Sequence, residues 1–82
     1  MRVIANIPHE EMKISVFSWN GKYLIKLEKG GFEQTYKISE MDFTDDAELE
    51  KMLDEEFLDK VLDIFQTMMQ TWRDAKDRLD SL

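Results

Sequence analysis

Two dipeptides, Asn20-Gly21 and Gly30-Gly31, constrain the fold more than any other feature of the sequence. Each supplies the positive φ angles that a two-residue β-hairpin turn requires. The three segments that they separate, within residues 13–39, are rich in β-branched and aromatic residues, which favour strands. Residues 13–39 therefore predict three consecutive antiparallel strands joined by two tight turns.

The length of each turn fixes which residues lie opposite each other. The first turn places Phe17 opposite Leu24, and the second places Ile25 opposite Tyr36. Within residues 2–7, alternating apolar side chains before Pro8 predict one more strand, at the N-terminus. Pairing Ile7 with Met12 across a short polar turn would set Val3 opposite Val16.

These registers assign the side chains of the sheet to two faces. The predicted inner face is apolar and should form the core; it contains Val3, Ala5, Ile7, Met12, Ile14, Val16, Tyr23, Ile25, Leu27, Phe32, Tyr36 and Ile38. Three separately inferred registers agree on this face, and such agreement supports the fold. The opposite face is mostly polar, as expected for the solvent side of an antiparallel sheet.

The second half of the chain predicts helix. Residues 44–80 contain neither Gly nor Pro, and Thr44 is a good N-cap with acidic residues in the turn that follows. A second cap at Asp54, with Leu53 and Leu58 spaced as a hydrophobic staple, predicts a break there. The expected fold is α+β: a four-stranded antiparallel meander (1–40) and a long C-terminal helix, either continuous or broken near Asp54, packed on one sheet face within a single domain (1–82).

The C-terminal helical region has an apolar surface about twice as wide as one sheet face requires. One stripe follows Phe57, Val61, Ile64, Met68 and Ala75. The neighbouring stripe has alternating four- and three-residue spacing and contains Leu58, Leu62, Phe65, Met69 and Trp72. Burial on two sides would explain this width, so the second stripe predicts the contact between two copies in a homodimer, or with another protein partner.

The inventory of catalytic side chains is small. There is no cysteine, and His9 is the single histidine; it lies in an expected turn beside Glu10 and Glu11. The sequence has no zinc-protease, phosphate-loop or EF-hand pattern. We therefore expect no enzymatic activity, no metal site and no cofactor. No apolar run reaches the ~20 residues of a membrane span, so a cytoplasmic protein is expected.

The predicted outer face contains aromatic and apolar side chains among lysines: Phe17, Trp19, Leu24, Lys13, Lys22, Lys26 and Lys37. Aromatic rings stack on bases and lysines contact phosphates, so this face is a candidate for binding single-stranded nucleic acid. Four antiparallel strands followed by a helix resemble the topology of Whirly, Pur and positive-cofactor-4-like domains, and the resemblance implies a dimer acting on single strands. Alternatively, a chain terminus or a second copy covers the apolar side chains.

Charge is unevenly distributed along the chain, whose formal net charge is −7. Residues 1–40 carry six basic and five acidic side chains, whereas residues 41–82 carry five basic and thirteen acidic ones. Phosphate attraction supplies most non-specific affinity for nucleic acid, so this balance disfavours that partner. A non-enzymatic homodimeric interaction or regulatory module is therefore the first expectation, and a nucleic-acid-binding protein is the alternative.

Overall fold

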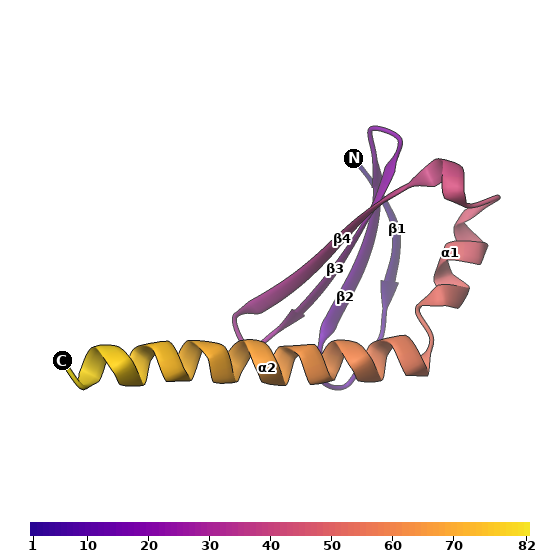
Figure 1. Cartoon of the computed structure of the whole chain (residues 1–82). Helices are drawn as coiled ribbons and strands as arrows, with labels where there is room; N and C mark the ends of the chain where they lie inside the picture. The colour runs from indigo at the N-terminus through magenta and orange to yellow at the C-terminus, as the bar shows by residue number, and fades with distance from the viewer. The chain divides into compact units, whose positions relative to one another are not determined.

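The computed structural model describes every residue from Met1 to Leu82 and divides into two compact units, Met1–Met52 and Leu53–Leu82. The first unit contains four strands: β1 (Arg2–Ile7), β2 (Lys13–Trp19), β3 (Lys22–Lys29) and β4 (Phe32–Ser39). A short 3-10 helix, η1 (Glu40–Asp42), and helix α1 (Asp46–Met52) follow. The second unit is helix α2 (Glu55–Asp80) (Figure 1). The predicted α+β class, four antiparallel strands followed by a long C-terminal helix, is confirmed, with α1 as an additional short helix.

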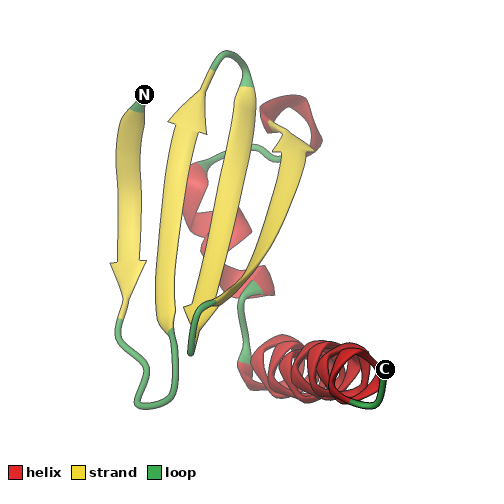
Figure 2. Cartoon of the chain, turned by 90° about the vertical axis from the view of Figure 1, so that its left-hand side faces the viewer, coloured by secondary structure: helices red, strands yellow, loops and turns green.

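The strands form one open antiparallel sheet in the order β1-β2-β3-β4 (Figure 2). Asn20 and Gly21 have φ values of 56° and 77°, and Gly30 and Gly31 have values of 55° and 87°. Both turns thus have positive φ at both central residues, as a type I′ hairpin turn requires. The registers that these turns predict between β2 and β3 and between β3 and β4 are confirmed.

The predicted register between β1 and β2 is wrong. Ile7 lies opposite Ile14 instead of Met12, because the loop is longer than the predicted four-residue turn. A bulge between Val3 and Ala5 then inserts one extra residue. A one-residue insertion moves the following side chain to the other face. Val3 consequently lies opposite Phe17, on the outer face, and is 57% exposed.

The core of the first unit lies on the predicted inner face. Helix α1 lies on one side of the sheet (Figures 1 and 2), and the hydrogen bond from Tyr23 to Asp46 identifies that side as the inner face. The buried side chains of the sheet and its loop are Met12, Ile14, Val16, Tyr23, Ile25 and Leu27. Leu49 of α1 is also fully buried. Burial of these apolar side chains stabilises the unit. Phe32, Tyr36 and Ile38 of the edge strand β4 are only half-buried.

Both helices begin at acidic caps. Asp45, and not the predicted Thr44, accepts the backbone N–H of Glu48 at 2.8 Å before α1. The break predicted near Asp54 is confirmed: its carboxylate accepts the backbone N–H of Phe57 at 2.9 Å at the start of α2. Leu53 and Leu58 are both buried, as expected for residues of a staple.

Candidate interaction surfaces

The outer face of the sheet carries a continuous apolar row. Val3, Phe17 and Leu24 lie opposite one another on three neighbouring strands, and Lys37 continues the row on β4. Phe17 and Leu24 are half-buried because side chains on adjacent strands cover each other's flanks. Sequence reasoning missed Val3 as a member of this row, since nothing in the residues around the bulge signals the extra residue.

Trp19 extends the apolar area toward the Asn20-Gly21 turn. Its side chain is 54% exposed, and it lies opposite Lys22 in the ladder. The registers of β2, β3 and β4 place all seven predicted residues of this surface on one face. We call this face, together with Val3, the outer-face surface; it comprises Val3, Lys13, Phe17, Trp19, Lys22, Leu24, Lys26 and Lys37.

The lysines of the outer-face surface differ in their pairing. Lys26 lies 3.5 Å from Glu33 across the β3–β4 ladder, whereas Lys13, Lys22 and Lys37 form no ion pair. The hydroxyl of Thr35 donates to Glu33 at 2.7 Å. This hydrogen bond, followed by the charge of Lys26, holds the pKa of Glu33 below its usual value. Three ammonium groups therefore remain available to an anionic ligand.

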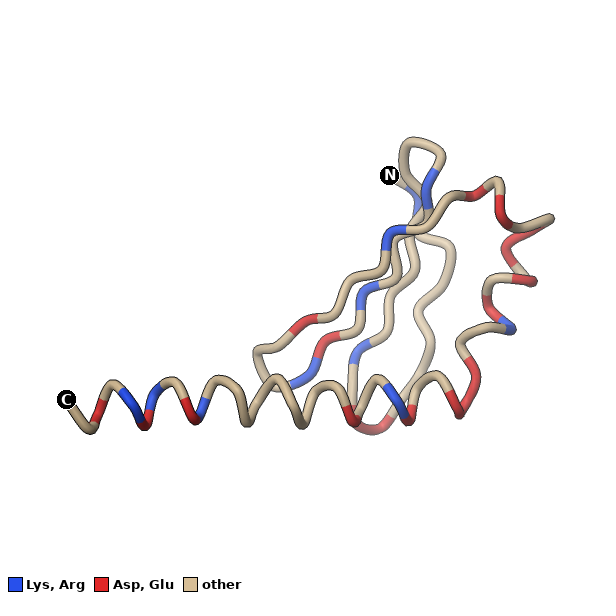
Figure 3. Tube along the Cα trace, in the orientation of Figure 1, with Lys and Arg blue, Asp and Glu red and all other residues tan.

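The α2 surface changes in exposure along the helix. Of the predicted contact residues, Leu58 and Phe65 are buried, Leu62 and Met69 are half-buried, and Trp72 is 62% exposed. Leu79, about two helical turns beyond Trp72, is 63% exposed. The segment 64–72 carries no charge, and Figure 3 shows it as a tan stretch of α2 between segments with red and blue residues. The apolar face thus continues past the buried residues into solvent.

A polar cluster joins the sheet to the segment around α1. The hydroxyl of Tyr23 donates to Asp46 at 2.6 Å, and Arg2 lies 3.7 Å from the same carboxylate. The Tyr23 ring packs edge-on against Phe43, with 5.8 Å between ring centroids. The hydrogen bond to Asp46, together with burial, raises the pKa of Tyr23 to about 12. Sequence reasoning did not find this cluster, because its members come from distant parts of the chain.

Ser18 and Glu40 extend the same cluster. The hydroxyl of Ser18 donates to the carboxylate of Glu40, and the Glu40 backbone N–H donates to Gly21 at 3.0 Å. Each polar group in the cluster therefore has a partner within the chain. These contacts hold the segment after β4 on the sheet, and they account for the cluster without a ligand.

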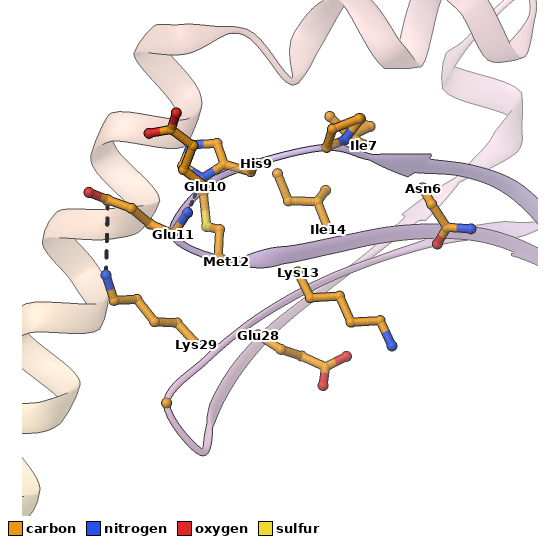
Figure 4. Close-up of a pocket in the computed structure, with 12 residues that line it drawn as sticks. Asn6, Ile7, His9, Glu10, Glu11, Met12, Lys13, Ile14, Glu28 and Lys29 are labelled. Atoms are coloured by element: carbon orange, nitrogen blue, oxygen red, sulfur yellow. Dashed lines mark hydrogen bonds and ion pairs between the residues drawn. The ribbon is translucent and has the colours of Figure 1, made fainter.

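A shallow hollow of about 650 Å³ lies at the loop between β1 and β2, against the β3–β4 turn (Figure 4). His9, Glu10 and Glu11 come from the loop, and Lys29 lies 3.9 Å from Glu11. The Nδ1 atom of His9 accepts the backbone N–H of Glu11 at 3.1 Å. The lining combines both signs of charge, and no group of three or more potential ligands converges to hold a metal ion.

No protein-family model matches the chain, and neither a curated protein nor a solved structure is significantly similar to it. None of the helices is both long and apolar enough to span a membrane. The surfaces of the chain itself are therefore the basis for assigning a function.

Proposed function

We propose that the chain is a small non-enzymatic protein-interaction module that forms a homodimer through α2. The observation that carries this proposal is the exposed continuation of the apolar face, with Trp72 62% and Ile64 44% exposed. Large exposed apolar side chains that share one face are typical of protein contacts. Ile64, Met68 and Trp72 follow one another at four-residue spacing, so they lie on the same side of α2.

The charges at the ends of the uncharged segment favour an antiparallel pair of helices. Asp63 precedes the segment and Arg73 follows it, while Met68 lies at its centre. An antiparallel pair centred on Met68 sets Ile64 beside Trp72 of the second copy and keeps the acidic first turns of the two helices apart. A parallel pair would instead place the acidic first turns of both helices side by side, which is unfavourable. Of the contact residues predicted from the sequence, this helix pair includes Met69 and Trp72. It also includes Ile64 and Met68, which were not in that set.

Sedimentation velocity tests the proposal. The wild-type chain should sediment as more than a monomer at high micromolar concentration, and Trp72→Glu should lower the sedimentation coefficient. Gln66→Glu is the matched control, since it adds the same charge at an exposed position on the side of α2 away from Met68. A wild-type chain that sediments as a clean monomer at high micromolar concentration would contradict the proposal.

Binding of single-stranded nucleic acid by the outer-face surface is a second candidate. The row Val3–Phe17–Leu24, the exposed Trp19 and the three unpaired lysines support it. Stacking of a base on an aromatic ring contributes about 1–3 kcal/mol per base. The net charge of −7 opposes phosphate binding, so affinity should be weak and should fall steeply with added salt.

A labelled oligonucleotide titrated at low salt tests this second candidate. A Trp72→Phe chain leaves Trp19 as its single tryptophan, so quenching of its fluorescence reports on the outer-face surface. Trp19→Ala should weaken binding, and Lys22→Gln should weaken it more than Lys60→Gln, a control on α2. If the oligonucleotide does not quench the fluorescence of Trp19 and its own mobility does not change when the protein is added, this second candidate is contradicted.

A further inference from the structure

The edge strand β4 presents unused backbone groups. It is the last strand in the sheet order, so one of its sides has no neighbouring strand. Lys29 and Phe32 close a two-residue turn and form a hydrogen-bonded pair, and such pairs alternate along an antiparallel ladder. Phe32, Gln34, Tyr36 and Ile38 therefore bond to β3. The backbone N–H and C=O groups of Glu33, Thr35 and Lys37 point away from the sheet.

The opposite edge of the sheet, β1, does not present a regular row of free backbone groups. β1 contains the bulge between Val3 and Ala5, which interrupts the spacing of its backbone groups. Arg2 is tied to Asp46 at one end of β1, and Pro8 follows the other end. Bulges and prolines are features that block strand addition. β4 has eight residues in continuous register with β3 and neither feature.

We propose that β4 pairs antiparallel with β4 of a second copy, in a register centred on Thr35. This register sets Glu33 of each chain opposite Lys37 of the other. Thr35 lies opposite Thr35 on the twofold axis. Opposite charges and paired threonines directly across a ladder are favourable. The exposed lysine, which alone would discourage strand addition, thereby meets a carboxylate of the same strand in the other copy.

The other registers are less favourable. A register centred on Glu33 sets two Glu33 side chains opposite each other, and one centred on Lys37 does the same with two lysines; both are repulsive. Registers centred on Gln34 or Tyr36 leave both charged residues opposite neutral ones. The register centred on Thr35 is thus the one that pairs every charge of the strand.

The inner side of β4 fits the same register. Phe32 of one copy lies opposite Ile38 of the other, and Gln34 lies opposite Tyr36. All four side chains are half-buried in the single chain. Pairing would cover more of the apolar surface of Phe32 and Ile38, which is favourable. Both sides of the strand therefore support the same alignment.

This contact is separate from the proposed contact of α2. A chain with two different twofold contacts assembles into a tetramer if the contacts close, or into a linear array if they do not. Removing one contact should leave dimers held by the other. The two proposals can therefore fail independently.

Charge reversal in a Trp72→Glu background isolates the β4 contact. In this background, the chain should remain a dimer by sedimentation equilibrium at high micromolar concentration. Adding Glu33→Lys should give a monomer, and so should adding Lys37→Glu, because each change sets like charges opposite one another. An equimolar mixture of these two monomers should return to dimer mass, since every pair across the ladder then joins opposite charges. The chain that carries both reversals should likewise be a dimer.

Thr35→Pro provides an independent test. It removes a backbone N–H that points away from β3, so it should block pairing while leaving the ladder of the sheet intact. Far-UV circular dichroism checks that each variant is folded. A Trp72→Glu chain that is already monomeric would overturn the β4 proposal. Dimers that survive either single reversal, or monomers that fail to pair on mixing, would overturn it as well.

Discussion

The two faces of the sheet are formed by the same strands, yet they differ in how their apolar side chains are used. On the inner face, Ile14, Val16 and Leu27 are at most 1% exposed, and they stabilise the fold by burial. On the outer face, Phe17 and Leu24 are half-buried and Trp19 is exposed. Apolar side chains on the inner face are thus explained by folding, whereas those on the outer face remain accessible to a partner.

Truncating one leucine on each face gives the largest expected effect. Leu27→Ala should lower the free energy of unfolding by about 3 kcal/mol, because it leaves a cavity in a fully buried site. Leu24→Ala, on the outer face of the same strand, should cost less than about 1 kcal/mol, because this side chain is only half-buried. Urea unfolding of both variants measures the difference. Equal costs would mean that the outer face is also part of the core.

Tyr23 makes the inner face sensitive to high pH. Its folded-state pKa of about 12 exceeds the ordinary value of 10.0, because the proton is held in the hydrogen bond to Asp46. The stabilisation is therefore fully present below pH 10.0 and is lost as the pH rises from 10.0 toward about 12. Tyr23→Phe should be less stable than wild type at pH 8, and the difference should shrink across that window. A difference in thermal stability that stays constant with pH would contradict this expectation.

Glu33 makes stability decrease on acidification, whereas Tyr23 makes it decrease at high pH, and the expected effect of Glu33 is smaller. Its pKa lies below the ordinary value of 4.5, mainly because of the hydrogen bond from Thr35 and then the charge of Lys26. The stabilisation is present above pH 4.5 and is lost as the pH falls through the lower folded-state pKa. Thr35→Val should therefore be slightly less stable than wild type at neutral pH and should match it in strong acid. Thermal unfolding at several pH values checks this, and a gap that widens on acidification would contradict it.

Turn chemistry explains which parts of the sheet could be predicted from the sequence. Asn20-Gly21 and Gly30-Gly31 each form a two-residue turn that fixes the register of the two flanking strands, and both predicted registers are confirmed. The loop after Ile7 has no such dipeptide, so its length was misjudged. The bulge near Val3 has no local signal either. Both errors concern one strand, and together they hid the contribution of Val3 to the outer-face surface.

Local capping was predictable for the helices, whereas contacts across the chain were not. Asp54 and its flanking leucines were sufficient to locate the start of α2. At α1, two neighbouring residues can both act as caps, and the structure uses Asp45 instead of Thr44. The bond between Tyr23 and Asp46 joins residues far apart in sequence, and no short pattern encodes it. Periodicity identified the apolar face of α2, but it gave no indication of where along the helix that face becomes exposed.

The bulge in β1 has a consequence for how far a sheet of this kind can grow. Strand addition at both edges would let copies join without limit, as they do in fibrils. With β1 irregular and β4 regular, each sheet has a single edge suited to addition. Pairing of two β4 strands uses that edge in both molecules at once. The irregular strand β1 would thereby limit strand pairing to two copies of the chain.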